Sequence, residues 1–504
     1  MLITCLILAF IIYARKHKIF NFVKIKKNDA GKTEMMLNGK NIMLNMFLLA
    51  LPIMFSNLLK SIHDVVDLYY VGEIVLPGVA PEVAEKSLEA MFSAINVTTP
   101  IINVCQALAM GFMVAGLSLM SQYLGAKKEE KARAVSANLL IFCFIVGVVT
   151  NILLFFLAPA ILDLMGAEGE IYKYSVMYVR YRSFELIGLF VFFAFQATRQ
   201  SSGDTVTPVI LNVISVILNI IFSGVFILGF KMDISGAALG TVIANMIIIV
   251  PCIILLFFDK KSSLRLKWSD FKFDFHYMKK LARLGIPAAL SQAFTSLAFL
   301  LINSLILSFD SNVIAGISGG NKINSLLLFP AMAIGTVLST FVGQNVGAGN
   351  SKRARKCVVS ATILSIIITV IGAILLFAFS KPLVVFILRN TPNAVDPCMR
   401  YMYFLVVGLP MMGLFQIFIG TFQGAGRTSL GLLLSSFRLW VLRIPVIWFM
   451  INVLDRGESS VWYAMIISNF GAIILGLILY VFVDFKPTIN KRKKLVEELT
   501  NGKE

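Results

Sequence analysis

Apolar residues occur in long blocks along this chain, and short polar segments separate them. A helix needs about 20 apolar residues to cross a membrane. Twelve blocks are long enough, and they lie near residues 42–71, 90–122, 134–162, 174–199, 206–229, 235–258, 281–308, 313–345, 357–380, 400–424, 428–453 and 461–483. Strands of a membrane barrel would alternate polar and apolar residues over about ten positions, and these blocks do not. The pattern therefore predicts an all-α polytopic membrane protein with twelve transmembrane helices.

Composition agrees with this class. The chain has 504 residues, of which 58% are hydrophobic and only 14% are charged, and its mean hydropathy is +0.85. A soluble domain has about a quarter of its residues charged. The net charge of +18 raises the question of nucleic acid binding. That function would need a basic face with aromatic platforms in a soluble module, and the sequence has no such module.

Positive charge is concentrated in alternate loops. Most lysines and arginines lie in the N-terminal tail, the even-numbered loops and the C-terminal tail, including Lys260, Lys261, Lys352, Arg353 and Lys491. The first odd-numbered loop is acidic. Because basic loops stay on the cytoplasmic side during insertion, we expect a multi-pass protein of the cell (plasma) membrane with both ends of the main bundle in the cytoplasm. The basic segments are expected to touch membrane lipid.

The first 14 residues, MLITCLILAFIIYA, are apolar but short. As a helix they would reach about 21 Å, less than a hydrocarbon core of about 30 Å. Basic residues follow the apolar run instead of preceding it, which is the wrong order for a cleaved signal peptide. Two interpretations stay open, a short anchor that starts outside and a helix that lies at the membrane surface. Residues 1–40 are predicted to comprise this segment and a basic linker.

Three segments occur twice in the same order. QYLGAKKEEKAR (122–133) aligns with QNVGAGNSKRAR (344–355), QSSGDT (200–205) with QGAGRT (423–428), and LPIMFS (51–56) with IPAALS (286–291). These repeats predict two six-helix lobes, at residues 41–258 and 284–483, joined by a cytoplasmic linker at 259–283 and followed by a basic tail at 484–504. An even number of spans per copy gives both lobes one orientation, so a pseudo-two-fold axis along the membrane normal should relate them.

Several motifs resemble the multidrug and toxic compound extrusion (MATE) family. They are LPIMFSNLLKSIHDVVDLYYVG, GLSLMSQYLGAKKEEKA, SSGDTVTPVILNVISVILNI, ISGAALGTVIAN, FPAMAIGTVLSTFVGQNVGAGNSKRA and FQGAGRTSLG, and the resemblance covers residues 42–483. It implies a secondary active antiporter that exports organic cations or amphipathic drugs in exchange for inward H⁺ or Na⁺ by alternating access. The expected partners are a small-molecule substrate and membrane lipid, without nucleic acid, and the expected state is a monomer.

The first span is interrupted by Lys60, His63, Asp64 and Asp67. Their spacing of three, four and seven residues puts them on one face of a helix. Charges are costly in a bilayer and usually face the bundle interior or a wet cavity. Lys60 and Asp64 fit a structural ion pair. For Asp67 the favoured role is functional, because buried ionisable groups of membrane proteins mark ion and substrate pathways.

The resemblance implies a coupling site in the N-lobe. Asp67 falls at the aspartate of the family's first-helix pattern, and Asn219 and Thr241 match its asparagine and threonine. Ser223 stands where the family often has a second aspartate. The predicted ion- or proton-coupling site is therefore Asp67, Asn219, Ser223 and Thr241. His63 and Asp64 are expected next to it or near the lobe interface.

The coupling ion is predicted to be H⁺ rather than Na⁺. With Ser223 in place of a carboxylate, the site has one negative ligand, and lower ligand charge weakens hard-cation binding. A single carboxylate can still carry one proton per cycle. No cofactor and no metal other than Na⁺ at this site is expected. Thr295 and Met412 stand where some family members have Glu and Asp, so a carboxylate site in the C-lobe is not expected.

Other charges lie inside predicted spans, and we expect them to pair between helices: Arg180, Arg182, Glu185, Lys322, Arg438 and Arg443. Arg182 and Glu185 have the spacing of a helical pair. The arginines and Lys322 also keep an alternative open, a lipid or polysaccharide flippase of the same superfamily. An enzyme is not expected, since the chain has no phosphate-binding loop and no HExxH motif.

Overall fold

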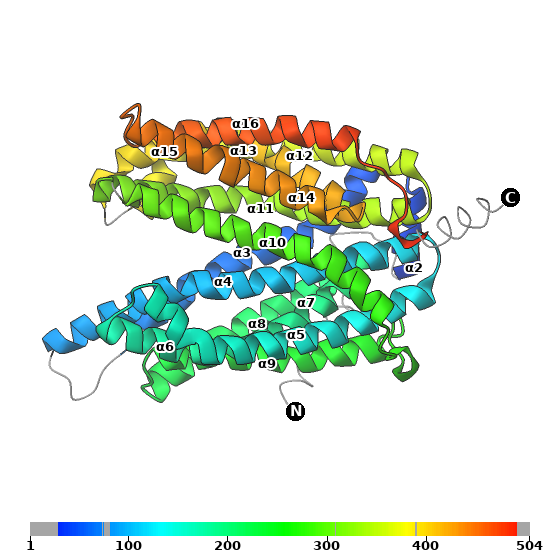
Figure 1. The fold of residues 1–504 in the computed structure, drawn as a ribbon, viewed down its shortest axis with the longest axis horizontal. Coiled ribbons are helices and arrows are strands. Elements are labelled where there is room, and N and C mark those ends of the chain that lie inside the picture. Colours follow the sequence, from blue (N-terminus) through cyan, green and yellow to red (C-terminus); the bar gives the residue numbers. More distant parts are fainter. Residues whose placement is uncertain (1–28, 73, 75–80, 308, 389–390, 491–504) are drawn as a thin grey trace, which may run out of the picture. The chain divides into compact units, whose positions relative to one another are not determined.

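The computed structural model of the chain describes residues 29–72, 74, 81–307, 309–388 and 391–490. Side chains at 60–69, 71–72, 81–82, 84–85 and 490 lie outside this description. The described residues form α-helices with short π- and 3-10-helical segments and no strands (Figure 1). The question whether residues 1–14 cross the membrane falls outside the described residues.

The observed helices confirm the predicted all-α membrane architecture. In chain order they are α3 (Ile42–Gly72), α4 (Pro81–Gly125), α5 (Glu129–Leu164), α6 (Gly169–Ser183), α7 (Glu185–Ser201), α8 (Val206–Gly224), α9 (Ile234–Phe258), α10 (Phe275–Ile306), α11 (Ser311–Gly347), α12 (Ser351–Ile387), α13 (Val395–Gly424), α14 (Thr428–Ser436), α15 (Ile444–Asn452) and α16 (Ser459–Val481). The π-helix η1 (Val225–Gly229) follows α8, and η4 (Phe437–Arg443) joins α14 to α15. Within the described residues, eleven helical segments are long and apolar enough to cross a membrane.

The fourth predicted span is divided at Phe184, which is why it is absent from these eleven. Its halves, α6 and α7, have 15 and 17 residues. At the division the Phe184 N–H donates to the Tyr181 carbonyl at 3.3 Å, and the Ser183 hydroxyl donates to the Arg180 carbonyl at 2.7 Å. A serine hydroxyl bonded to a carbonyl of the preceding turn competes with the helical backbone bonds, and such bonds are often found where helices bend. Arg180, Arg182 and Glu185, which flank the break, also lower the mean hydropathy of this span.

The predicted N-terminal linker contains a helix, α2 (Asp29–Asn38). Its apolar anchor is Met36, which is fully buried. The Asn345 amide donates to the Met36 carbonyl at 3.3 Å, and the Arg353 guanidinium donates to the Gly39 carbonyl at 2.6 Å. These bonds satisfy carbonyls at the end of α2, which have no partner within the helix.

Contacts group the chain into two compact units. Among the described residues, unit 1 comprises 29–32, 55–116 and 129–289, and unit 2 comprises 33–54, 117–128 and 290–490. The helices α3, α4 and α10 therefore each contribute residues to both units. The lobe boundaries that the repeats suggest, at 41–258 and 284–483, stay predictions.

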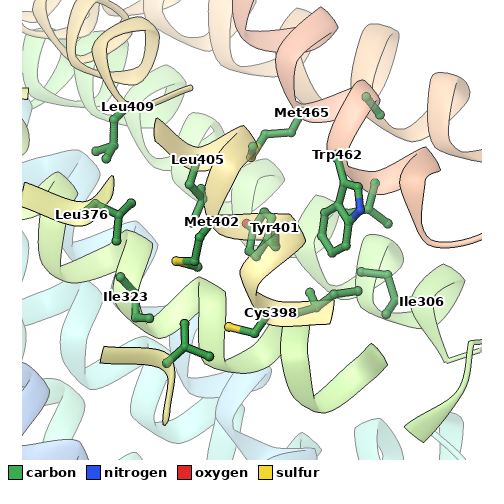
Figure 2. Packing of buried hydrophobic residues seen from close by; sticks show 14 of the residues in the cluster. Ile306, Ile323, Leu376, Cys398, Tyr401, Met402, Leu405, Leu409, Trp462 and Met465 are labelled. Atoms are coloured by element: carbon green, nitrogen blue, oxygen red, sulfur yellow. The ribbon is translucent and has the colours of Figure 1, made fainter. Parts of the chain in front are cut away.

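An apolar cluster of unit 2 surrounds α13 (Figure 2). Tyr401 stacks on Trp462 of α16 with ring centroids 4.7 Å apart, and its hydroxyl donates to Asn321 Oδ1 of α11 at 2.7 Å. Met402, Leu405 and other apolar side chains pack around this pair. Since lipid tails are as apolar as these side chains, close packing and hydrogen bonds hold membrane helices together.

Two repeated glycines make reciprocal contacts inside unit 2. A Cβ on Gly125, at the end of α4, would collide with the Gln344 carbonyl of α11. A Cβ on Gly347, at the end of α11, would collide with the Gln122 carbonyl of α4. These residues occupy equivalent places in the repeated segments 122–133 and 344–355. The repeat thus corresponds to a symmetric crossing of two helix ends, which only glycine permits at this distance.

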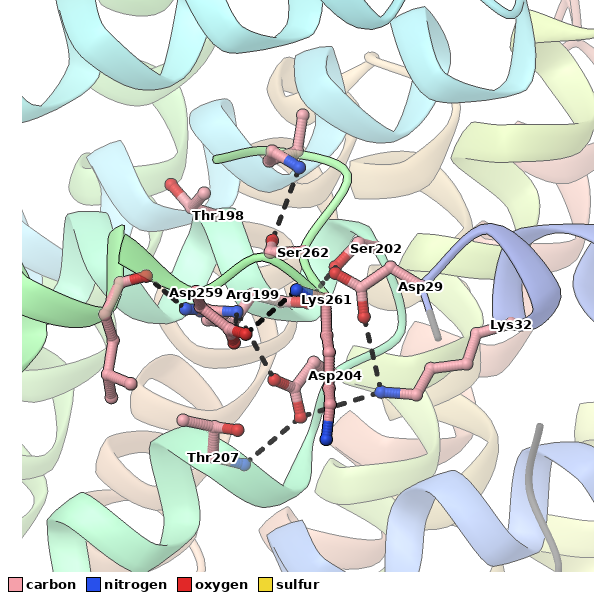
Figure 3. Close-up of polar contacts among 12 residues, drawn as sticks. Asp29, Lys32, Thr198, Arg199, Ser202, Asp204, Thr207, Asp259, Lys261 and Ser262 are labelled. Carbon is pink, nitrogen blue, oxygen red and sulfur yellow. Dashed lines mark hydrogen bonds and ion pairs between the residues drawn. The ribbon is translucent and has the colours of Figure 1, made fainter. Parts of the chain in front are cut away.

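Unit 1 contains a network of charged residues centred on Arg199, at the end of α7 (Figure 3). Its guanidinium lies 2.9 Å from the Asp259 carboxylate and 3.8 Å from that of Asp204. Lys32 of α2 lies 3.7 Å from Asp204 and 3.5 Å from Asp29. The network therefore attaches the start of α2 to α7 and to the residue that follows α9.

The carboxyl group of Asp29 is part of this network and is only 4% exposed. Burial raises its pKa, and the nearby Asp204 carboxylate raises the pKa further, while Lys32 and Arg199 lower it. Burial disfavours the charged form of an acid, and so does a neighbouring negative charge. The Ser202 hydroxyl donates to Asp29 Oδ2 at 3.1 Å.

Candidate functional site

A row of polar side chains joins α8 to α9 in unit 1. Ser215, Asn219 and Ser223 are four residues apart on α8, and Thr241 and Asn245 are four apart on α9, so each set shares one helical face. The Asn219 amide Nδ2 donates to Thr241 Oγ1 at 2.9 Å. One turn away, Ser215 Oγ donates to Asn245 Oδ1 at 2.8 Å. We call these five residues the polar seam.

Two oxygen atoms of the polar seam have no hydrogen-bond donor among the described residues, Asn219 Oδ1 and Ser223 Oγ. Both side chains are buried, with exposed fractions of 1% and 0%. The Thr241 hydroxyl spends its only proton on the Ala237 carbonyl at 3.1 Å, so it must accept from the Asn219 Nδ2 group. The Thr241 hydroxyl therefore cannot donate to the amide oxygen of Asn219. A buried acceptor without a partner costs about 1–3 kcal/mol.

A close approach of the two helices positions Ser223. A Cβ on Gly240 of α9 would lie 2.5 Å from Ser223 Oγ and 2.7 Å from the Ser223 backbone nitrogen. Only glycine leaves room for α8 at this point. The π-helix η1 begins two residues after Ser223, and such segments frequently occur at functional sites.

The helix α3 lies against α8 at two places. The Asn212 amide donates to Ser56 Oγ at 2.8 Å, and the Tyr70 hydroxyl lies 3.0 Å from the position of a Cβ built on Gly224. The chain between Ser56 and Tyr70 is helical. It includes four predicted residues whose side chains lie outside the described part of the structure, namely Lys60, His63, Asp64 and Asp67.

The structure thus brings together two of the four residues predicted for the coupling site. Asn219 and Thr241 are hydrogen bonded, and Ser223 lies one turn further along the same face of α8. The predicted place of Asp67 within the site stays a prediction, as do those of His63 and Asp64.

Sequence reasoning did not single out the second hydrogen-bonded pair of the polar seam, Ser215 and Asn245. Glu185 of α7, which is 4% exposed, pairs with Arg182 Nε at 2.7 Å, as the spacing of the two residues predicted. It also accepts a hydrogen bond from Asn245 Nδ2 at 3.1 Å. The chain of bonds therefore runs from Ser215 through Asn245 to a buried carboxylate. The sequence offered one signal for this pair: Ser215 lies four residues before Asn219, and Asn245 lies four residues after Thr241.

In unit 2, Thr295 and Met412 stand where some members of the family have Glu and Asp, and they make other contacts here. The Thr295 hydroxyl donates to the Ser291 carbonyl of its own helix at 2.7 Å. The Met412 sulfur accepts from Arg438 Nη1 at 2.9 Å. Lys322 is exposed. Among the side chains that the structure describes, these places hold no carboxylate.

A family model described as MatE matches residues 82–225 and 287–449, which together exceed half of the chain. The chain belongs to the MatE family. The matched stretches take in the α8 half of the polar seam up to Ser223 and the arginines of η4. This MatE chain is therefore a multi-pass membrane protein of a transporter family.

Two curated relatives match most of the MatE chain. The probable multidrug resistance protein YoeA of Bacillus subtilis is 25% identical over 427 residues, covering 83% of this chain and 89% of its own. The multidrug export protein MepA of Staphylococcus saprophyticus is 25% identical over 448 residues, covering 88% and 95%. A crystal structure of MATE in complex with MaL6 is 20% identical, covers 88% of this chain and 96% of that chain, and has a TM-score of 0.81. The solved structure supports the fold.

Proposed function

We propose that this protein is a secondary active antiporter that exports organic cations or amphipathic drugs across the cell membrane. Inward movement of H⁺ or Na⁺ through the polar seam of unit 1 drives the export. Both ends of the helical bundle lie in the cytoplasm in this proposal. The names of the relatives YoeA and MepA support the drug-export part, and the basic even-numbered loops support the orientation.

The coupling site rests on two buried oxygens that have no donor among the residues that the structure describes, Asn219 Oδ1 and Ser223 Oγ. A protonated carboxylic acid can donate one hydrogen bond to such an oxygen, and Na⁺ can be coordinated by both. Asp67 supplies the carboxyl group in this proposal. It lies in the part of α3 between Ser56 and Tyr70, the two residues that contact α8.

We propose H⁺ rather than Na⁺ as the coupling ion. Besides the proposed Asp67 carboxylate, the ligands would be one amide oxygen and one hydroxyl. Thr241 is less suited to coordinate a cation, because its hydroxyl oxygen already accepts a hydrogen bond from the Asn219 amide and its hydroxyl proton is donated to the Ala237 carbonyl. A site with few charged ligands binds a hard cation weakly, whereas proton transfer needs only the carboxylate.

Proteoliposomes containing the purified protein and a fluorescent organic cation test the proposal. A pH gradient without Na⁺ should drive accumulation of the dye, and a Na⁺ gradient at equal pH should have little effect. Asp67→Asn should abolish the gradient-driven movement, because asparagine keeps the volume but cannot carry a proton. Asp64→Asn is the matched control on the same helix, and it should affect the amount of folded protein more than coupling.

Normal gradient-driven export by Asp67→Asn would remove Asp67 from the mechanism. Export that follows the Na⁺ gradient alone would overturn the choice of ion but keep the site. Ser223→Asp tests the site independently, since a second carboxylate beside Asn219 should shift the dependence towards Na⁺. A flippase would instead move a labelled anionic lipid between leaflets and leave the organic cation where it is.

A further inference from the structure

Unit 2 buries two arginines within one turn of π-helix. Arg438 is 3% exposed and Arg443 is 8% exposed, and both belong to η4. The Ile444 N–H donates to the Leu439 carbonyl, five residues earlier. In an α-helix, neighbours on one face are three or four residues apart. The five-residue bonds of a π-helix bring Arg438 and Arg443 onto one side instead.

Among the described residues, the hydrogen-bond acceptors of the two guanidinium groups are all neutral. Arg443 donates from Nε to Ser468 Oγ at 2.9 Å and from Nη2 to Asn469 Oδ1 at 2.8 Å. Arg438 donates from Nη1 to the Met412 sulfur at 2.9 Å and to the same Asn469 oxygen at 3.5 Å. One amide oxygen of α16 therefore lies between two buried positive charges.

Arg438 also keeps a donor unused. Its Nε is buried and has no hydrogen-bond partner in the described part of the chain. The guanidinium carbon lies 4.3 Å from the centre of the Phe415 ring, a contact that offsets little of the cost of burying a charge. No carboxylate among the described residues forms an ion pair with either arginine.

The buried arginines of unit 1 differ in this respect. Arg199 has the Asp259 carboxylate at 2.9 Å, and Arg182 has the Glu185 carboxylate at 2.7 Å. Arginine stays protonated in proteins, and a buried charge without a counter-charge is strongly destabilising. Within the described part of the chain, the pair in η4 therefore lacks the carboxylate partner that each of these two arginines of unit 1 has.

The repeat makes the contrast sharper. Arg438 lies 223 residues after Ser215, the offset of the repeated segments QSSGDT and QGAGRT, and Asn469 lies 224 residues after Asn245. In unit 1 the asparagine accepts from Ser215 and donates to Glu185. In unit 2 the equivalent asparagine accepts from two arginines. The repeated asparagine therefore contacts a carboxylate in unit 1 and two guanidinium groups in unit 2.

We propose that Arg438 and Arg443 form a binding site for a small monovalent anion. The anion supplies the missing negative charge and accepts a hydrogen bond from Arg438 Nε, while Asn469 holds the two guanidinium groups in place. Chloride and the carboxylate of a small organic molecule share this chemistry. The inference goes beyond the proposed antiport, because it concerns unit 2 and requires no movement of H⁺ or Na⁺.

Equilibrium binding of radioactive chloride to the detergent-purified protein, in a buffer whose anion is a bulky sulfonate such as Hepes, tests this inference. We expect saturable binding of about one chloride per chain and a higher unfolding temperature in chloride than in the sulfonate buffer. Displacement of the label by acetate would identify carboxylate as a second ligand, and displacement by bromide but not by acetate would restrict the site to halides. A protein with no saturable binding of either anion overturns the proposal.

Variants locate the site. Arg438→Met and Arg443→Met should each weaken chloride binding by about thirtyfold or more, because a buried charge contact is lost. Arg400→Met is the control, since this arginine of unit 2 has a 67% exposed side chain and pairs with Glu458. Arg438→Lys and Arg443→Lys keep the charge but lose the planar fork, and should bind chloride more weakly.

The lysine variants decide the question if the methionine variants do not fold. Unchanged chloride affinity in both lysine variants would place the anion elsewhere and refute the proposal. Methionine variants that fold, are more stable than the wild type and have lost no chloride binding would refute it as well. Asp67→Asn should bind chloride normally, so failure of the antiport proposal is distinguishable from failure of this one.

Discussion

Replacing Gly240 by alanine tests the close approach of α8 and α9. The added methyl would lie 2.5 Å from Ser223 Oγ, 2.7 Å from the Ser223 backbone nitrogen and 2.9 Å from its Cα. Non-bonded atoms of this kind prefer separations of about 3.5–4.0 Å, so the helices must separate by roughly 1 Å. Overpacking typically costs about 1–3 kcal/mol, and the gain of alanine over glycine in a helix offsets about 0.5–1 kcal/mol.

The contact with backbone atoms of Ser223 puts the overpacking cost in the upper part of its range, so the net prediction for Gly240→Ala is a loss of about 1–2.5 kcal/mol in the free energy of unfolding. Thermal unfolding in detergent should show a lower midpoint than for the wild type, and drug export should fall because Ser223 moves away from its place. Gly372→Ala is the matched control, since the nearest atom to its added methyl is Leu327 Cδ2 at 3.7 Å. That variant should be as stable as the wild type or more stable.

A double variant separates the two kinds of clash. Ser223→Gly removes the side-chain oxygen but leaves the backbone atoms, so it should restore only part of the stability lost in Gly240→Ala. Complete restoration would assign the whole clash to the Ser223 hydroxyl. If Gly240→Ala unfolds at the wild-type temperature and exports at the wild-type rate, the deduced packing of α8 against α9 is wrong.

Three further predictions concern stability. Arg199→Met should cost about 3–5 kcal/mol, since it removes the guanidinium that pairs with the buried carboxylate of Asp259, and comparing its thermal unfolding with that of the Arg199→Met/Asp259→Asn double variant would reveal this coupling. Gly347→Ala should unfold at a lower temperature than the wild type, because its methyl collides with the Gln122 backbone. Asp29→Asn should stabilise the attachment of α2 at neutral pH, as judged by hydrogen exchange. The pKa of Asp29 is raised in the folded protein. The protonated carboxyl group therefore contributes favourably to the free energy of unfolding below pH 3.8, its ordinary pKa, and this contribution is lost as the pH rises through the raised pKa.

The apolar pattern predicted the helices well because lipid requires long apolar segments. The fifth predicted span, 206–229, has the limits of α8 together with η1. The division at Phe184 escaped prediction because it arises from local hydrogen bonds rather than from hydropathy. Helix α2 has ten residues, and its large apolar side chains are limited to Met35, Met36 and Leu37, so a count of long apolar blocks cannot find it.

The candidate site could be predicted only in part. Asn219 and Thr241 came from the resemblance to a family; the structure shows a hydrogen bond between them, and their role in coupling stays a prediction. Asn245 was visible as a residue one turn after Thr241, but nothing in the sequence indicated its bond to Glu185, which lies on a third helix. Unpartnered oxygen atoms such as Asn219 Oδ1 are a property of three-dimensional packing and have no sequence pattern.

The arginine pair shows a different limit of sequence reasoning. Two residues five apart face different directions on an α-helix, so the sequence pattern indicates no pair between Arg438 and Arg443. The π-helical segment changes the angle between them, and its position is not encoded in the apolar pattern. Asn469 then receives hydrogen bonds from both side chains. A repeat that keeps one asparagine in each unit can therefore change the charge of its surroundings without changing the fold. For this reason the coupling carboxylate is sought in unit 1 and the anion in unit 2.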